Sequence, residues 1–146
     1  MHEAQVKTSM NLVSVGLCVA ALAFFVIPTR VHGAEGGGKE KPAFQGKLPN
    51  VPGKSLTAIV VRYEPGGKSG PHHHAGSVFA YVLSGQIRSR NSATGPAKVY
   101  SAGESFFEPP GSVHLISENA STTAPASLLA VIVADDGATL TTPEKR

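Results

Sequence analysis

The sequence predicts an all-β protein, either a sandwich or a barrel. After residue 33, no segment has the apolar period of a helix of useful length. Short runs of alternating apolar residues recur instead, and clusters rich in Gly and Pro separate them. The chain has 146 residues, which suits one domain. We therefore expect a single small β-domain.

The first residues are predicted to be a secretory signal that spans residues 1–33 and is removed. A polar start containing Lys7 precedes an uncharged apolar run over residues 11–27, and residues 31–33 suit a signal-peptidase site. An uncleaved membrane anchor is the alternative, but the run is shorter than the roughly 20 residues of a spanning helix. We expect a secreted or periplasmic protein with no stable membrane insertion after cleavage.

The remaining chain is expected to divide into three parts. Residues 34–47 are predicted to be a flexible linker, because a glycine run is followed by Lys, Glu and Pro without an apolar period. Residues 48–134 are predicted to form the folded domain, and residues 135–146 a polar tail. The net charge of +3 is scattered, and aromatic and basic residues do not interleave. This pattern does not indicate a nucleic-acid partner.

The strands of the domain follow from the alternation of apolar residues. They are predicted over residues 55–63, 78–83, 86–90, 97–100, 105–107, 113–117 and 127–133. The segment 78–83 is apolar on both faces, which requires a cover for its outer side. A domain this small is marginal alone. We therefore expect a homodimer, with Phe79 and Tyr81 as contact residues.

Histidines are concentrated in one place. Three of the four that follow residue 33 form the run His72-His73-His74. In an extended segment His72 and His74 point to one side and His73 to the other. The fourth, His114, follows a Pro-Pro-Gly turn. Because imidazole is the commonest metal ligand, we predict that His72, His74 and His114 meet around one divalent transition metal ion. The alternative is a solvated loop without a role.

The histidine run lies within a pattern that resembles the first motif of the cupin family. Gly66 is followed after five residues by His72-His73-His74, and Gly85 closes the motif. The family pattern also has a Glu at residue 78 or 79, where this chain has Val78 and Phe79. An apolar group therefore takes the place of a carboxylate. Three neutral imidazoles would leave the full charge on a divalent ion.

A second segment resembles the second cupin motif. Gly103 is followed after five residues by Pro109-Pro110-Gly111 and after two more by His114, with Asn119 near the end. The resemblance implies an all-β jelly-roll barrel, also called a double-stranded β-helix. It also implies that His72, His74 and His114 are metal ligands, with Fe, Mn, Ni, Cu or Zn as the ion.

Glu108 lies beside the turn that delivers His114. It could be a fourth ligand, a partner that fixes a histidine tautomer, or a catalytic base. The alternative is a surface acid at the end of a strand. As a base, Glu108 would take a proton from the substrate.

Two functions fit these residues. The first is a small-molecule oxygenase resembling the quercetin-type dioxygenases, with an aromatic or enolic diol as substrate and an apolar chamber lined by Val78, Ala80 and Val82. Open positions on the metal would hold substrate and dioxygen. The second is a non-catalytic module that binds a metal or a ligand. A metal that only joins two sheets is a third, plainer interpretation.

Overall fold

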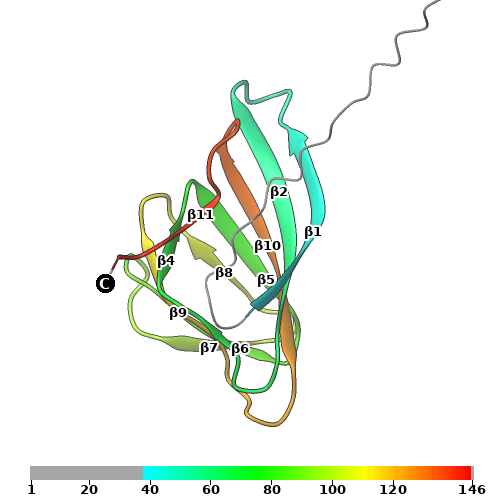
Figure 1. Cartoon of the computed structure of the whole chain (residues 1–146), viewed down its shortest axis with the longest axis vertical. Helices are drawn as coiled ribbons and strands as arrows, with labels where there is room; N and C mark the ends of the chain where they lie inside the picture. The colour runs from blue at the N-terminus through cyan, green and yellow to red at the C-terminus, as the bar shows by residue number, and fades with distance from the viewer. Residues whose placement is uncertain (1–37, 146) are drawn as a thin grey trace, which may run out of the picture.

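The computed structural model describes residues 38–145, and within this range the chain forms eleven β-strands and no helix. The strands build two antiparallel sheets, shown in Figure 1. The five-stranded sheet contains, in order, β1 (Gly38–Lys47), β2 (Lys54–Tyr63), β10 (Ala126–Asp135), β5 (Ser77–Ser84) and β8 (Ser105–Glu108). The six-stranded sheet contains β11 (Thr141–Pro143), β4 (His72–His74), β9 (Val113–Asn119), β6 (Gln86–Asn91) and β7 (Lys98–Ser101), with β3 (Lys68–Ser69) paired to β9. The predicted all-β jelly-roll barrel is confirmed.

The core lies between the sheets, and strand alternation places apolar side chains there. Along β2 the alternate residues Thr57, Ile59 and Tyr63 are buried, whereas Arg62 on the other face is exposed. Two apolar clusters fill the interior. One is formed by Tyr63, Ala80, Val82, Ile87, Ala126 and Leu128, and the other by Ile59, Val78, Ile132 and Ala134. The first cluster joins the two sheets, because Ile87 of β6 packs there against side chains of the five-stranded sheet.

The connection between β4 and β5 carries the chain from one sheet to the other. Gly76 is required there, because a Cβ atom at this position would collide with the carbonyl group of Val133. The crossing brings Val78 into the interior directly after the histidine run, where it is 1% exposed. The histidines and Val78 therefore face each other from opposite sheets. They do not share one strand face.

The predicted flexible linker over residues 34–47 is wrong for Gly38–Lys47, which forms β1 and pairs with β2 along its whole length. Residues 34–37 lie outside the described part of the chain. β1 is the outermost strand of its sheet, and Lys and Pro are tolerated at such edges. The register shifts between Pro42 and Phe44, which accommodates the proline. The absence of an apolar period therefore reflects an edge strand.

The predicted polar tail over residues 135–146 is wrong for most of its length. Asp135 ends β10, and residues 141–143 form β11, which pairs with β4. Between them, Ala138 and Leu140 pack against the apolar cluster that contains Val78. In Figure 1 the C-terminal segment crosses the molecule to reach β4. The end of the chain thus supports the strand that carries the histidines.

The predicted signal over residues 1–33 lies outside the described residues. Within residues 38–145, the structure contains no helix with the length and apolar character needed to cross a membrane.

Candidate metal centre

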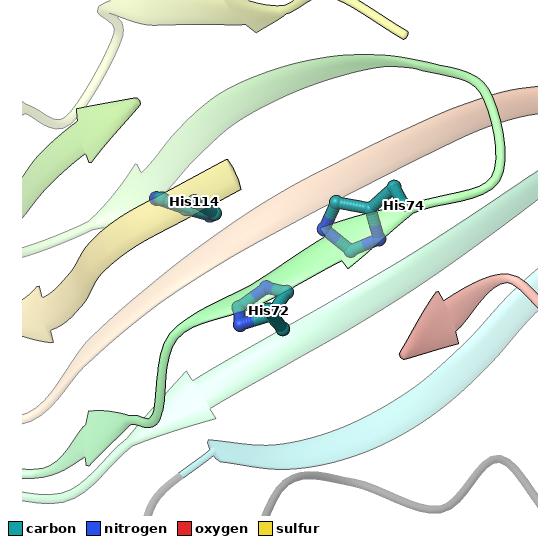
Figure 2. A group of neighbouring side chains, drawn as sticks. All are labelled: His72, His74 and His114. Carbon is teal, nitrogen blue, oxygen red and sulfur yellow. The ribbon is translucent and has the colours of Figure 1, made fainter. Parts of the chain in front are cut away.

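Two neighbouring strands of one sheet bring the three predicted histidines together, as Figure 2 shows. β4 and β9 are antiparallel, and His72 lies directly opposite His114. His74 lies two residues farther along β4 and therefore on the same face. One ring nitrogen from each histidine lies within 4.8 Å of the others. His72 and His114 are buried, with 6% and 3% of their surface exposed.

His73 points away from this group, as the alternation predicted. Its Nδ1 lies 2.9 Å from the Glu144 carboxylate, outside the barrel. The backbone amide of Glu144 also donates a hydrogen bond to the Pro71 carbonyl oxygen. These contacts attach the C-terminal segment to the outer side of β4.

Backbone carbonyl groups fix the tautomers of both β4 histidines. Nδ1 of His72 donates to the Gly70 carbonyl oxygen at 2.7 Å, and Nδ1 of His74 donates to the Leu140 carbonyl oxygen at 3.2 Å. A carbonyl oxygen can only accept a hydrogen bond, so in each neutral ring the proton is on Nδ1. The free electron pair is therefore on Nε2. This arrangement is typical of metal-binding histidines.

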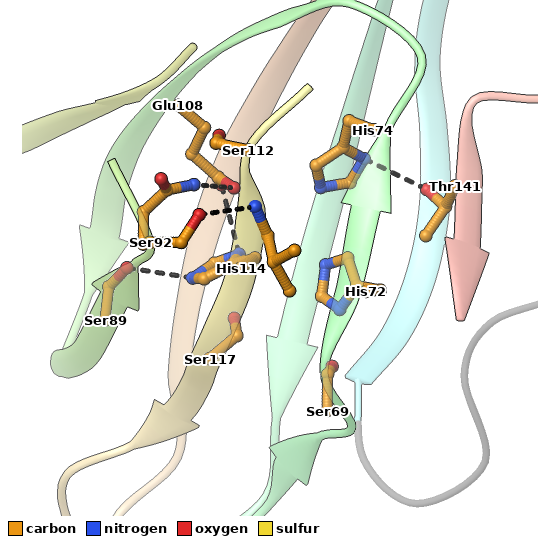
Figure 3. A network of polar contacts seen from close by, with 12 residues as sticks. Ser69, His72, His74, Ser89, Ser92, Glu108, Ser112, His114, Ser117 and Thr141 are labelled. Atoms are coloured by element: carbon orange, nitrogen blue, oxygen red, sulfur yellow. Dashed lines mark hydrogen bonds and ion pairs between the residues drawn. The ribbon is translucent and has the colours of Figure 1, made fainter. Parts of the chain in front are cut away.

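His114 is held by side chains on both sides of its ring (Figure 3). Its Nδ1 lies 3.1 Å from the Glu108 carboxylate and donates to it. Its Nε2 lies 2.8 Å from the Ser89 hydroxyl, which donates to the lone pair of that nitrogen. A metal bound at Nε2 would have to take this lone pair from Ser89. His114 thus has the tautomer that a metal ligand needs, with the proton on Nδ1, but the Nε2 lone pair already accepts a hydrogen bond from Ser89.

Burial keeps the β4 histidines neutral. It lowers the pKa of His72 to about 4, although the hydrogen bond to Gly70 opposes the shift. Burial also lowers the pKa of His74. Metal ions bind the neutral form of imidazole, so these rings need not release a proton at neutral pH. Three imidazole nitrogens gathered in one buried place fit a divalent transition metal.

Glu108 is buried, with 4% of its surface exposed, and is not the surface acid of the alternative interpretation. Burial acts to raise its pKa, but the hydrogen bond from His114 and the electrostatic effect of the three neighbouring histidines outweigh it, and the pKa is lowered. The Asn91 amide donates to its second oxygen at 3.3 Å. Glu108 is therefore a buried carboxylate directly beside the histidine group.

The position of Glu108 bears on the missing carboxylate of the first motif. In the pairing of β5 with β8, Glu108 lies directly opposite Val78. Partners in an antiparallel pair point to the same face, so both side chains face the interior. The carboxylate expected at residue 78 is therefore absent, and a carboxylate stands on the neighbouring strand instead.

The histidines and Glu108 line a small chamber of about 50 Å³ between the sheets. Val78 and Ala80 form part of its apolar wall, as predicted. Val82 is buried in the adjacent cluster and does not line the chamber. The volume exceeds that of a single water site but is far below the several hundred Å³ of pockets for drug-sized ligands.

Among the chamber-wall residues that sequence reasoning missed are Glu40 of β1 and Thr141 of β11. Glu40 pairs with Val61 and therefore points inward, and burial raises the pKa of its carboxyl group. The Thr141 hydroxyl lies 3.2 Å from Nδ1 of His74. Both lie in segments predicted to be a linker or a tail. Lys and Pro around Glu40 were the available signal of an edge strand.

Comparison with solved structures gives the same fold. An uncharacterized conserved protein with a double-stranded β-helix domain from Klebsiella pneumoniae subsp. pneumoniae matches with a TM-score of 0.57 and 19% identity, over 77% of this chain and 89% of that chain. A DMSP lyase from Ruegeria pomeroyi matches with a TM-score of 0.52 and 22% identity, over 62% of this chain and 45% of that chain.

A third structure is oxalate decarboxylase from Bacillus subtilis, whose Mn(II) centres have been studied. It matches with a TM-score of 0.55 and 25% identity, over 73% of this chain and 28% of that chain. Among curated proteins, no sequence matches this chain. The family model of the cupin domain matches residues 59–132, a range that contains the three histidines and Glu108. The chain belongs to the cupin family.

Proposed function

We propose that this protein is a metal-dependent enzyme, an oxygenase that acts on a small molecule. The observation that carries the proposal is the pair of β4 histidines. Backbone oxygens accept hydrogen bonds from their Nδ1 atoms, and their Nε2 lone pairs have no partner in the part of the chain that the structure describes. His72, His74 and His114 would hold a divalent transition metal. When bound, such an ion supplies Lewis acidity and sites for an anionic substrate and dioxygen.

Glu108 is the proposed catalytic base. A general base must be unprotonated and lie within reach of the reacting group. The lowered pKa of Glu108 keeps it ionised at neutral pH, and its side chain lines the chamber. Asn91 and His114 hold the two carboxylate oxygens in place. Glu108 would accept the proton that an enol or a phenol releases on binding.

The chamber limits the part of the substrate that reaches the histidines. Its volume of about 50 Å³ accommodates an ion and a few further atoms. A compact enolic diol fits this space better than a multi-ring aromatic diol. The similarity to oxalate decarboxylase, at 25% identity, supports compact anionic substrates as a class.

The same small volume favours the second candidate, a metal-binding module without turnover. In that case the ion would be retained and no organic substrate would enter. The two candidates differ in oxygen consumption and share the requirement for a bound metal.

The test begins with elemental analysis of protein purified without added metal. Oxygen uptake by metal-loaded protein is then measured against a panel of compact enols, catechols and thiols. An oxygenase consumes oxygen with at least one member, and Glu108→Gln lowers the rate in metal-loaded protein. Stoichiometric metal without uptake under any condition supports the binding module. Absence of metal binding overturns both.

Homodimer formation is proposed from the outer face of the five-stranded sheet. The register aligns Phe44, Ala58, Val131, Phe79 and Phe107 in one row across all five strands. Phe44, Phe79 and Phe107 are 59%, 46% and 50% exposed. An apolar row of this length is typical of a contact surface. Phe79→Lys is expected to shift the protein from dimer to monomer in sedimentation analysis.

Export is proposed from the pattern of residues 1–33 alone. Mass spectrometry of protein from the extracytoplasmic fraction tests it. A mature chain that begins at Ala34 is the expected result. A chain retained at full length in the cytoplasm would contradict it.

A further inference from the structure

A second cavity, of about 270 Å³, opens where β7 and β8 lie at the edges of the two sheets. Its walls come from β6, β7, β8 and the loop between β6 and β7. It is several times larger than the metal chamber and approaches the volume of pockets that hold organic ligands, which begins at about 300 Å³. None of the roles proposed above places a ligand in this cavity.

Phe106 separates the two spaces, because its side chain lines both. The centre of its ring lies 5.9 Å from that of His114, on the chamber side, and 4.9 Å from that of Tyr100, on the side of the second cavity. A ligand can therefore occupy the second cavity without entering the metal chamber.

The chemistry of the cavity suits an anion with an apolar body. The Lys98 ammonium lies 4.8 Å from the centre of the Tyr100 ring, and within residues 38–145 no carboxylate lies at salt-bridge distance from it. Tyr100, Phe106 and Phe107 supply aromatic surface. A cation next to ring faces attracts a carboxylate attached to a flat apolar group.

Two buried polar side chains, Ser89 and Asn91, complete the cavity. The Ser89 hydroxyl donates to Nε2 of His114, and the Asn91 amide donates to Glu108. A ligand in the cavity would therefore lie next to groups that contact His114 and Glu108. Binding of such a ligand should therefore shift the NMR signals of the His114 ring.

We propose that this cavity is a second binding site, for a small organic anion with a single ring and one carboxylate. Lys98 pairs with the carboxylate, and the aromatic side chains contact the ring. The site requires no metal and does not rest on the oxygenase proposal. It can therefore be tested on metal-free protein, with metal binding measured separately.

The test compares benzoate with benzamide, which has nearly the same shape but no charge. Titration calorimetry on the metal-free protein is expected to give a roughly millimolar Kd for benzoate. Lys98→Met should weaken benzoate about fivefold, the upper range for an exposed ion pair, and leave benzamide nearly unchanged. Lys68→Met removes the same charge from an exposed residue outside the cavity and should leave benzoate binding unchanged.

Two further variants locate the ligand. Ala97 lines the cavity, so Ala97→Phe should fill it and abolish benzoate binding, whereas His74→Ala should retain binding. In NMR spectra benzoate should shift the ring signals of His114 and not those of His73. Urea unfolding confirms that each variant is folded. The proposal is overturned if benzoate does not bind the wild-type protein, or if His74→Ala abolishes binding while Ala97→Phe does not.

Discussion

The histidines of β4 and the histidine of β9 are held in different ways. Backbone carbonyl groups of Gly70 and Leu140 fix His72 and His74, and within residues 38–145 their Nε2 atoms have no hydrogen-bond partner. Side chains fix His114, and both of its ring nitrogens have partners. β4 has three residues and depends on β11 and β9 for pairing, whereas β9 has seven residues between β4 and β6.

Because of this difference, the tautomers of the β4 histidines and the affinity for the metal should respond to different substitutions. Substitutions of neighbouring side chains leave backbone acceptors in place, so the β4 histidines should keep their tautomers in most variants. His114 depends on Ser89 and Glu108, each of which can be removed by one substitution. Substitutions of the side chains around His114 should therefore change the affinity for the metal more than substitutions around the β4 histidines.

The largest expected effect is loss of the metal itself. His74→Ala and His114→Ala each remove one of three nitrogen donors and should abolish stoichiometric binding. His73→Ala should retain it, because its ring points outward to Glu144. Elemental analysis of the purified variants after metal loading is the measurement. Equal losses in all three variants would contradict the arrangement of β4.

The next effect is the pH dependence of folding in the metal-free protein. The pKa of His72 is about 4 in the folded state, because burial disfavours its charged form, against 6.5 for the exposed group. Unfolding therefore takes up a proton between these values, and stability is highest above pH 6.5 and falls as the pH decreases toward 4. The loss from this residue is about 3 kcal/mol. His74 acts in the same direction, because its pKa is also lowered.

Urea unfolding at pH 7 and at pH 4.5 measures this difference. His72→Gln removes the titrating group and should reduce the pH dependence. The charged and titratable groups that face His72 are His74, His114 and Glu108, and all three remain in that variant. An unchanged difference between the two pH values in His72→Gln would show that His72 is not the source.

The outline of the fold could be predicted from the sequence, because buried strands carry a period that the residues show directly. The predicted strand over residues 55–63, which lies within β2, is an example. β1 and β11 could not be found this way. They are edge strands, and pairing with a neighbour determines their structure more than their own side chains do. Glu40 and Thr141 were missed for this reason.

The histidine group was predicted correctly as a spatial group, because two motifs with fixed spacing carry it. The partners that orient the rings were beyond prediction. Gly70 and Leu140 act through carbonyl oxygens, which every residue has, so no residue type marks them. Ser89 reaches His114 only through the pairing of β6 with β9. Such contacts depend on register, which a single sequence specifies weakly.

Glu108→Gln should weaken metal binding about 10- to 100-fold, the usual range for loss of a carboxylate that orients a metal-binding histidine. Gln keeps the size of the side chain but removes the charge that Nδ1 of His114 faces. Competition with a fluorescent chelator gives the Kd. The matched control is Glu104→Gln, on an exposed acid near the start of β8, which should leave the Kd unchanged.

A double variant tests whether a carboxylate on β5 can replace Glu108 of β8. Because Val78 and Glu108 are direct partners across β5 and β8, Val78→Glu combined with Glu108→Val moves the carboxylate to the neighbouring strand. Metal affinity should be higher than in Glu108→Val alone. Equal affinities would mean that residue 78 does not reach the metal.

The smallest expected effect is an increase in metal affinity, whereas loss of a histidine or of Glu108 lowers it. The Ser89 hydroxyl donates to Nε2 of His114, and a metal must displace it. Ser89→Ala frees this lone pair, so metal binding should tighten by up to about fivefold, the worth of one neutral hydrogen bond. Thr141→Val is the control on the β4 side. It removes a hydroxyl 3.2 Å from His74 but leaves the Leu140 acceptor, so the Kd should stay within about twofold. Weaker binding in Ser89→Ala would mean that Ser89 positions the His114 ring for the metal, and the contrast between the two strands would then have to be reversed.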